Sequence, residues 1–539
     1  MSNESTNKPV LPRIKDFYEG KSVFITGATG YLGVVLLESL LRLCPEIERI
    51  YILVRPKKGV QPESRKEAIF KKLVFQVLRE TEPDVFQKVV VVSGDVSQPD
   101  LGMDEIGLQK IIENVSIVFH CAASISFLRP LSYILSHNAE GVVYTIELCR
   151  RLKKLKALVY TSTAFSNCNR QNTKIEENIY RLPFHSEKFI EVLRKGNESE
   201  MEEFMNLCHP HWPNYYTFSK NLAENIIKDS ASDLPTAIVR PSLIVNVWKK
   251  PTPGFVEDQS GLSALTIGVG KGFIRVLHGS PDARLDLVPV DVCAQVHLMA
   301  AMKASLERYP NPLVINCSSV CVTTLGDFTT SMMKKVKATP LPHTFRTPET
   351  LKIVPNDFLY RMTAIYEHYV PAFFFDLFLK MAGSKIRLTK KYKFVEAAIQ
   401  STSYFMTHSW DYERENLRKC FIDMQPEDRQ MLGTSFDGCD LEKLVEHVIT
   451  VNPFVSWTTD KKSKSERMHL AKQRYHVTSF IQAISIFVVV GFFGYGSSMQ
   501  SNQAMTVTVS ALILLQYVRV RIKDNPMDVG SDPPYVKML

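Results

Sequence analysis

The sequence lacks several features that mark specialised classes of protein. Its 539 residues hold only ten cysteines, with no CxxC pair and no zinc-type spacing to histidine, so we expect reduced thiols facing the cytosol and no metal. The N-terminus has no apolar stretch typical of a secretory signal, so synthesis is expected to begin in the cytosol. A strong charge imbalance is also missing, because 65 Lys and Arg against 56 Asp and Glu give only +9. No nucleic-acid partner is expected from that balance.

What the chain does contain is ordinary globular composition, 45% hydrophobic and 22% charged. This composition argues against a disordered, collagen-like or disulfide-scaffold protein. From Ser22 to about Val245, short Val/Ile-rich runs alternate with longer amphipathic stretches, which predicts βαβ units. We therefore expect an α/β fold with a Rossmann-type doubly wound parallel sheet.

The rest of the chain changes character and suggests further parts. Residues from about 251 to 345 suit an extension that caps the substrate, and the aromatic-rich stretch that follows predicts a mostly helical C-terminal domain. The predicted divisions are 1–20 polar tail, 21–345 dinucleotide-binding domain with its substrate extension, 346–458 helical domain, 459–477 basic juxtamembrane linker, 478–520 hydrophobic membrane anchor and 521–539 tail.

The most hydrophobic part of the chain lies near the C-terminus. Residues 480–499 are nearly free of charge and long enough to cross about 30 Å of hydrocarbon, whereas 504–518 is shorter. Basic residues flank the outer sides of both stretches, which favours a hairpin with both ends in the cytosol. One span with an interfacial helix is the alternative, and a buried helix of a soluble core remains open for 480–499. We expect a lipid bilayer partner and a main domain that faces the cytosol.

A glycine-rich segment follows the first predicted strand and opens an apolar helix pattern. Such a segment gives a tight turn, close backbone approach to a pyrophosphate and close helix packing. The helix N-terminus attracts the anion. We interpret it as a dinucleotide-binding site made by Thr26, Gly27, Thr29, Gly30, Tyr31, Leu32 and Gly33.

The end of the second strand indicates which dinucleotide binds. An NAD enzyme would place Asp or Glu there, but this chain has Arg55, followed by Lys57, where a 2′-phosphate would find a cation. We therefore expect NADPH, with a solvated basic loop as the alternative for Lys57. Asp95, next to Val96, is expected to accept from the adenine amino group or to form a simple turn. Ala122 and Ala123 are small enough to let the cofactor pass.

Tyr216 and Lys220 are spaced four residues apart, so both project from one face of a helix. A hydride transfer to a carbonyl needs a proton donor, and we expect Tyr216 to be that acid. Lys220 is expected to lower its pKa and to bind the ribose, and Thr163 to orient the carbonyl. Asn138 either holds a water that links Lys220 to solvent or is a structural amide.

These residues together resemble the extended short-chain dehydrogenase/reductase superfamily and, more closely, the fatty acyl-CoA reductases. The likeness covers nearly the whole chain; Phe165, where Tyr is usual, and Cys293 depart from the pattern. Pro241 joins the cofactor residues by this resemblance. The stretches that carry it are 23–33, 52–56, 162–167, 216–220, 239–242, 270–272 and 286–291.

The resemblance implies an NADPH-dependent enzyme that reduces a long-chain acyl-CoA to a primary alcohol through an aldehyde and releases CoA. It also implies a peroxisomal or endoplasmic reticulum membrane, with wax or ether-lipid synthesis as the use of the alcohol. Cys121 and Cys168 are inert thiols or form a thiohemiacetal. Lys271 and Arg275 meet CoA phosphates or lie on a solvated face.

Two other functions fit the same residues less well. A membrane-bound hydroxysteroid dehydrogenase or sugar-nucleotide epimerase of the superfamily would use the same Tyr and Lys, but the helical block and Arg55 count against it. A non-catalytic NADPH-binding scaffold would have no need for a positioned proton donor.

Overall fold

The computed structural model describes residues 11–451 apart from short gaps, together with scattered residues between 465 and 484. Lys57 and nearly all of the predicted anchor at 478–520 lie outside the described residues. Among the helices that are described, none is long and apolar enough to cross a membrane. The gaps fall at 57–61, 128, 258–260, 308, 319, 339–340, 342–343, 382 and 433–439.

Contacts group the chain into two compact units, each assembled from separate stretches of sequence. Unit 1 takes in residues up to 258, then 286–322 and 409–440. Unit 2 takes in 259–285, 323–408 and the residues from 441 onward. The chain thus leaves unit 1 after residue 258 and again after residue 322, and it returns both times. The predicted domain boundaries stay predictions.

Seven parallel strands form the centre of unit 1. They are β1 (Ser22–Thr26), β2 (Arg49–Val54), β3 (Val89–Ser93), β4 (Val115–His120), β5 (Ala157–Thr161), β7 (Thr236–Pro241) and β11 (Leu313–Cys317). Their order in the sheet is β11-β7-β5-β4-β1-β2-β3, which confirms the predicted doubly wound sheet. The direction of strand addition reverses between β1 and β4, and such sheets bind dinucleotides at this switch point.

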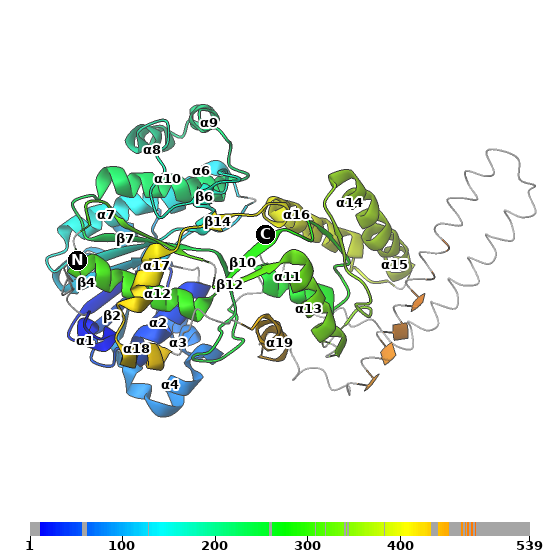
Figure 1. The fold of residues 1–539 in the computed structure, drawn as a ribbon, viewed down its shortest axis with the longest axis horizontal. Coiled ribbons are helices and arrows are strands. Elements are labelled where there is room, and N and C mark those ends of the chain that lie inside the picture. The colour runs from blue at the N-terminus through cyan, green and yellow to red at the C-terminus, as the bar shows by residue number, and fades with distance from the viewer. Residues whose placement is uncertain are drawn as a thin grey trace, which may run out of the picture. The chain divides into compact units, whose positions relative to one another are not determined.

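Helices cover both faces of this sheet (Figure 1). One face packs against α1, α2 and α12, and the other against α5, α7 and α10, so the central strands are buried along nearly their whole length. The helices of unit 1 are α1 (Ile14–Tyr18), α2 (Tyr31–Leu43), α3 (Pro62–Phe70), α4 (Gln76–Thr81), α5 (Glu105–Asn114), α6 (Leu131–Leu135), α7 (Gly141–Arg151), α8 (Ser186–Lys195), α9 (Glu198–Asn206), α10 (Tyr215–Ser230), α12 (Val290–Leu306), α17 (Glu415–Ile422) and α18 (Pro426–Leu432), with short turns η1 (Leu73–Phe75), η2 (Pro83–Lys88), η3 (Pro99–Gly102), η4 (Ser136–Glu140) and η5 (Ala164–Asn167).

Residues 409–440 complete the β11 edge of unit 1. Trp410 Nε1 donates to the carbonyl oxygen of Cys168 at 2.9 Å, and Asn416 Nδ2 donates to that of Val314 at 2.9 Å. Short strands add to the same unit: β6 (Lys174–Ile175) pairs with β14 (Asp411–Tyr412), and β8 (Leu243–Val245) pairs with β10 (Arg284–Pro289).

Unit 2 is mostly helical. The predicted helical domain at 346–458 overlaps it in 346–408 and again from 441, whereas 409–440 belongs to unit 1. The elements of unit 2 are α11 (Gly261–Gly270), α13 (Leu325–Ala338), α14 (Asp357–Ala364), η6 (Ile365–Tyr369), α15 (Val370–Met381), α16 (Leu388–Thr407), α19 (Leu441–Val451), β9 (Val276–His278) and β13 (Lys352–Val354); β12 (Cys321–Thr324) leads into it from unit 1.

A buried ion pair lies inside unit 2. Arg275 Nε contacts Glu367 Oε2 at 2.9 Å, and Arg275 Nη2 donates to Thr350 Oγ1 at 3.0 Å. Arg275 is only 6% exposed, so the solvated-face alternative is wrong for it. The Arg275 guanidinium is bound within unit 2, because the Glu367 carboxylate provides the negative charge that a buried cation needs. Lys271 is partly buried, and burial lowers its pKa.

Candidate active site

Residues 26–33, called the glycine loop, join β1 to α2 and pack closely against the chain that follows β4. Gly27 has a φ of +75°, and a Cβ there would lie 2.6 Å from the backbone nitrogen of Ala122. A Cβ on Gly33 would lie 2.2 Å from the Gly27 carbonyl oxygen. Gly30 caps α2, and its N–H donates to that same carbonyl at 2.9 Å. A side chain at Gly27 or Gly33 would fill the space beside the loop. The loop without side chains there is suited to binding a dinucleotide pyrophosphate.

Thr26 links the glycine loop to a buried histidine that sequence reasoning missed. Its hydroxyl lies 3.0 Å from His120 Nδ1 and accepts from the N–H of Ala122 at 3.3 Å. His120 Nδ1 also lies 3.0 Å from the Thr145 hydroxyl. Burial, and next the charge of Lys220, lower the pKa of His120 to about 3, so its ring is neutral. In the sequence, the one indication of a role for His120 is that it is a polar residue at the end of an apolar strand.

The Tyr31 side chain is not available as a cofactor ligand, because its hydroxyl is hydrogen-bonded within the protein. It donates to the carbonyl oxygens of Val245 and Phe255, at 3.1 and 2.9 Å. The carboxylate of Asp291 fixes the same stretch of chain by accepting from the N–H groups of Trp248, Lys249 and Lys250. What Tyr31 offers a cofactor is therefore its backbone at the start of α2.

The ends of β2 and β3 hold the predicted nucleotide-selecting residues. Arg55 is exposed just after β2. Asp95 accepts from the backbone N–H and the hydroxyl of Ser97, at 3.1 and 3.0 Å, so it forms the turn that the sequence left as an alternative. The other predicted cofactor residues are Thr29, partly exposed in the glycine loop, Leu32 and Val96, both buried, Ala123, partly exposed after β4, and Pro241, which ends β7.

Tyr216, Thr163 and Lys220, called the tyrosine site, come together where β5 ends beside α10. Asn214 caps α10 by accepting from Thr217 N at 2.9 Å, which fixes the first turn that carries Tyr216. Thr163 is the neighbour whose side chain lowers the pKa of the Tyr216 phenol, and its Oγ1 donates to the Pro241 carbonyl at 3.4 Å. Thr163 begins the η5 turn and accepts from the Phe165 N–H at 3.3 Å. The structure thus unites the acid and the orienting hydroxyl that the sequence predicts.

The electrostatics of the tyrosine site differ from the expectation. Burial raises the pKa of Tyr216 to about 12, and the hydrogen bond from Thr163 offsets only part of that rise. Burial also lowers the pKa of Lys220 to about 8. The Lys220 ammonium donates to the Thr161 carbonyl at 2.6 Å and lies 4.8 Å from the Tyr160 ring centre. The expected lowering of the Tyr216 pKa by Lys220 is therefore wrong for the protein alone, because desolvation dominates.

Asn138 is fully engaged by protein groups in the π-helical turn η4. Its Oδ1 accepts from the Ser124 N–H at 2.7 Å, and its Nδ2 donates to the Ser124 carbonyl and to the Ser219 hydroxyl, both at 2.9 Å. These contacts tie the chain after β4 to α10, as the structural-amide alternative requires. A water bridge from Asn138 to Lys220 stays a prediction.

A buried ion pair behind the tyrosine site was also missed. Glu224 lies one turn beyond Lys220 on α10, and its carboxylate contacts Arg240 Nη2 at 2.6 Å and Nε at 2.9 Å. Ser162 and Ser166 both donate to Glu224 Oε1. Both charged side chains are fully buried. The pair connects α10 to β7 and to the chain after β5, and the four-residue step from Lys220 to Glu224 is the one sequence signal that points to it.

The thiols nearest the site are poor nucleophiles. Burial raises the pKa of Cys121 to about 11 and that of Cys168 to about 12, which disfavours the thiolate. None of the nine cysteines of the described chain forms a disulfide. Among the described residues no group of His, Cys, Asp and Glu could hold a metal ion.

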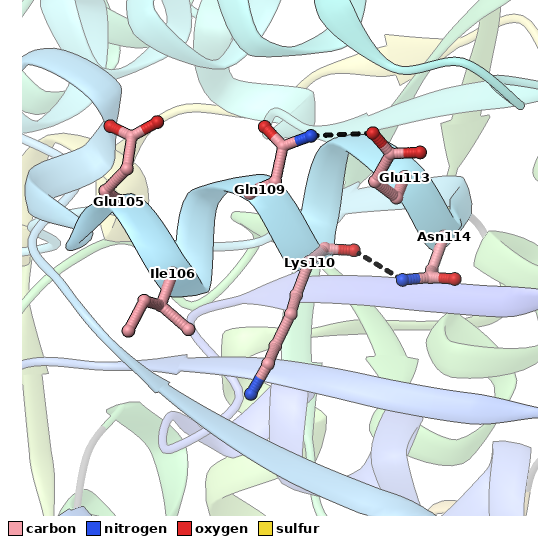
Figure 2. A pocket seen from close by; sticks show the side chains of 6 residues that line it. All are labelled: Glu105, Ile106, Gln109, Lys110, Glu113 and Asn114. Atoms are coloured by element: carbon pink, nitrogen blue, oxygen red, sulfur yellow. Dashed lines mark hydrogen bonds between the residues drawn. The ribbon is translucent and has the colours of Figure 1, made fainter.

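A shallow hollow on α5 has no part in this chemistry. Its lining comes from one exposed helix face, where Gln109 donates to Glu113 and Asn114 donates to the Lys110 carbonyl (Figure 2). Ile106 is 68% exposed there. One helix face cannot enclose a substrate, and the strand ends that carry the glycine loop and the tyrosine site lie elsewhere.

Comparison with known protein families matches two parts of the chain. A family model described as male sterility protein, of the NAD-binding type, matches residues 25–297, and a second model with that description matches 367–451. "Fatty acyl-CoA reductase 1" of Homo sapiens is 34% identical over 509 residues, which are 94% of this chain and 98% of that protein. "Fatty acyl-CoA reductase 2" of Bos taurus is 30% identical over 467 residues, which are 86% of this chain and 90% of that protein.

Solved structures with the same fold include two reductase domains. The terminal R domain of the myxalamid biosynthetic pathway has a TM-score of 0.52 at 20% identity, covering 80% of this chain and 90% of its own. The reductase domain of a nonribosomal peptide synthetase from Mycobacterium tuberculosis has a TM-score of 0.53 at 17% identity, covering 81% and 92%. At these identities the likeness concerns the fold.

Proposed function

The chain belongs to the fatty acyl-CoA reductase family, and from this premise we propose that it reduces a long-chain acyl-CoA thioester to a primary alcohol with NADPH. The observation that supports this most is the tyrosine site, where the neutral phenol of Tyr216 lies beside Thr163 at the edge of a sheet that carries the glycine loop. Going from thioester to alcohol takes four electrons, hence two hydrides, and CoA leaves after the first. When bound, the nicotinamide cofactor supplies those hydrides.

Tyr216 keeps its proton at neutral pH because its pKa lies near 12. It therefore donates that proton only to a group more basic than itself, such as the alkoxide oxygen that forms when a carbonyl is reduced. The Thr163 hydroxyl orients the same oxygen. Lys220, with its pKa near 8, carries its charge for much of the time at neutral pH and sits one turn along α10. Its ammonium holds a cofactor ribose and steadies the phenolate that proton transfer leaves.

NADPH is proposed over NADH because of the end of β2. The exposed Arg55 occupies the place where an NAD enzyme holds the ribose with a carboxylate. A cation there favours a 2′-phosphate. Replacing Arg55 with Glu should raise the KM for NADPH and leave kcat nearly unchanged, whereas an unchanged KM would remove the basis for this preference.

The decisive experiment measures products and stoichiometry. Purified enzyme is incubated with palmitoyl-CoA and NADPH, with absorbance for NADPH and mass spectrometry for lipids. We expect fatty alcohol with about two NADPH oxidised per CoA released, and a loss of about 10² to 10⁴ in rate in Tyr216→Phe. Tyr215→Phe, a neighbouring partly buried phenol on α10, is the matched control and should keep its activity.

The possible outcomes separate the alternatives. Aldehyde as the sole product would revise the endpoint of the reaction. A lack of acyl-CoA-dependent NADPH oxidation at several chain lengths would favour the steroid or sugar-nucleotide branch of the superfamily. Full activity in Tyr216→Phe would remove the assigned proton donor and leave the reaction itself to be tested by its products.

We also propose that residues 478–520 anchor the protein in a peroxisomal or endoplasmic reticulum membrane with the catalytic part in the cytosol. The proposal rests on the hydrophobic sequence and its basic flanks. Alkaline extraction of membranes from cells that express the full chain, beside a chain ending at residue 458, tests it. Release of the full chain into the alkaline supernatant would contradict an integral anchor.

A further inference from the structure

Residues 357–381 of unit 2 form one continuous helix that is apolar on two opposite sides. The elements α14, η6 and α15 follow one another without a break, since Ile365 and Val370 at the two junctions keep helical backbone angles. The inner side packs into unit 2. Its buried residues include Tyr360, Ala364, His368, Ala372, Phe375 and Leu379.

The other side of this helix, called the outer face, presents large apolar side chains to solvent. Eight of the sixteen exposed large hydrophobic residues of the described chain lie between 358 and 394, whereas those of unit 1 are scattered singly. A concentration of this kind marks an interaction surface. The outer face consists of Phe358 (69% exposed), Met362 (53%), Ile365 (49%), Phe373 (60%), Leu377 (41%) and Met381 (51%).

The π-helical turn η6 keeps the two halves of the outer face in line. An uninterrupted α-helix turns by about 100° per residue, which would rotate Phe373, Leu377 and Met381 about 100° away from Phe358 and Met362. The π-turn contains one extra residue. It therefore rotates the second half of the helix back by about 100°, which is the rotation of one residue. As a result the apolar residues of α14 and α15 lie along a single stripe, about 35 Å long at 1.5 Å per residue.

Positive charge lies at the C-terminal end of the outer face. Residues 377–395 contain six Lys and Arg and no Asp or Glu. Four of these lysines are exposed, and none of the four forms an ion pair with another described residue. Phe394, 40% exposed, lies on α16, which packs beside α15 (Figure 1). The four lysines are Lys380, Lys385, Lys390 and Lys393.

We propose that the outer face docks on an anionic lipid bilayer, with the helix lying in the plane of the interface. A stripe of Phe, Ile, Leu and Met, followed in sequence by lysines that form no ion pair with another described residue, has the chemistry of a helix that inserts its apolar side among acyl chains while its cations meet lipid phosphates. In a parallel two-fold contact with a second copy of this chain, the two lysine clusters would meet and repel, so the charge disfavours that arrangement. This contact depends neither on the proposed reaction nor on the anchor at 478–520.

Photo-crosslinking from the lipid tests the proposal on the full-length protein. The protein is reconstituted in nanodiscs that contain phosphatidylserine and a lipid with a diazirine in its acyl chain, and labelled peptides are mapped by mass spectrometry. Peptides from 357–381 should carry about fivefold more label than those of α5, which also exposes an apolar side chain in Ile106. Discs of phosphatidylcholine alone should reduce that label several-fold.

Matched variants distinguish this face from hydrophobicity in general. The triple variant Met362→Glu, Phe373→Glu, Leu377→Glu should lose most of the label at 357–381. The control variant Val77→Glu, Ile106→Glu, Leu207→Glu changes equally exposed residues of unit 1 and should keep it. An unchanged thermal unfolding temperature establishes that each variant is folded, because all six side chains point to solvent.

Three outcomes would overturn the proposal. The first is an absence of acyl-chain label on 357–381 in the folded wild type. The second is a protein–protein crosslink from the outer face to a second copy, with a doubled mass in solution. The third is an intramolecular crosslink from the outer face to 478–520, which would make the chain's own hydrophobic segment the occupant.

Discussion

The glycine loop and the tyrosine site, which we propose serve one reaction, are built in different ways. The glycine loop works through backbone atoms and through missing side chains, since a Cβ on Gly27 or Gly33 would overlap neighbouring backbone. The tyrosine site works through side chains, and its electrostatics come from burial and from partners such as Thr163. A backbone-built site is therefore sensitive to added atoms, whereas a side-chain-built site is sensitive to lost partners.

The largest effect should come from the support behind the tyrosine site. Glu224→Ala leaves the Arg240 guanidinium buried without its counter-charge, which should lower the free energy of unfolding by about 3–5 kcal/mol. Chemical denaturation measures this. Glu415→Ala, which breaks an exposed pair with Arg418, is the control and should produce no measurable change. Equal effects from the two variants would mean that the buried pair has no special role.

The glycine loop is tested by adding one carbon atom. Gly27→Ala forces a Cβ to within 2.6 Å of the Ala122 nitrogen, so we expect a loss of about 2–4 kcal/mol in stability together with weaker NADPH binding. Gly20 has a similar φ of +62° but no atom within 4 Å of the added Cβ. Gly20→Ala therefore carries only the backbone strain, about 1 kcal/mol. Thermal unfolding with and without NADPH compares them, and matching losses would show that close approach is unimportant.

The pKa of Lys220 predicts a pH dependence of stability in the absence of cofactor. Its ordinary pKa is 10.5 and its folded pKa is about 8, so between these values the unfolded chain binds a proton that the folded protein has released. Stability should therefore rise by about 3 kcal/mol as the pH increases across this window. Below pH 8 the folded protein carries the full penalty of the buried charge.

Lys220→Met should flatten that rise, and Lys228→Met, further along α10, should not. Chemical denaturation at several pH values through the window measures the slope. A slope that survives in Lys220→Met would assign the pH dependence to another group.

The smallest expected effect concerns His120, which joins the two sites. Its ring contacts Thr26 of the glycine loop and lies close enough to Lys220 for the charge to lower its pKa. His120→Gln should raise the KM for NADPH about fivefold, worth ~1 kcal/mol, with kcat preserved. His137→Gln is the control, because the hydrogen bonds of His137 among the described residues all lie within its own turn. A change in kcat alone would place His120 with the tyrosine site instead.

The same contrast explains what could be predicted from the sequence. Parallel strands buried on both faces appear in a sequence as continuous apolar runs, so β1, β2, β4, β5 and β7 were predictable. The glycines of the glycine loop were predictable too, because a close approach of the backbone requires glycine. The pKa of Tyr216 was not, because its direction depends on how deeply the phenol is buried. Nor was the Glu224–Arg240 pair, whose partners meet only when α10 packs on β7.

The return of residues 409–440 to unit 1 also affects how the protein is made. Trp410 and Asn416 bond to carbonyls of Cys168 and Val314, which leave the ribosome long before them. Domains generally fold during synthesis from the N-terminus onward. Unit 1, which holds the whole of the glycine loop and the tyrosine site, instead receives its last stretch only after residues 323–408 of unit 2 have been translated. A truncated translation product that ends before residue 409 therefore carries every proposed catalytic residue but lacks the edge that completes the fold around them.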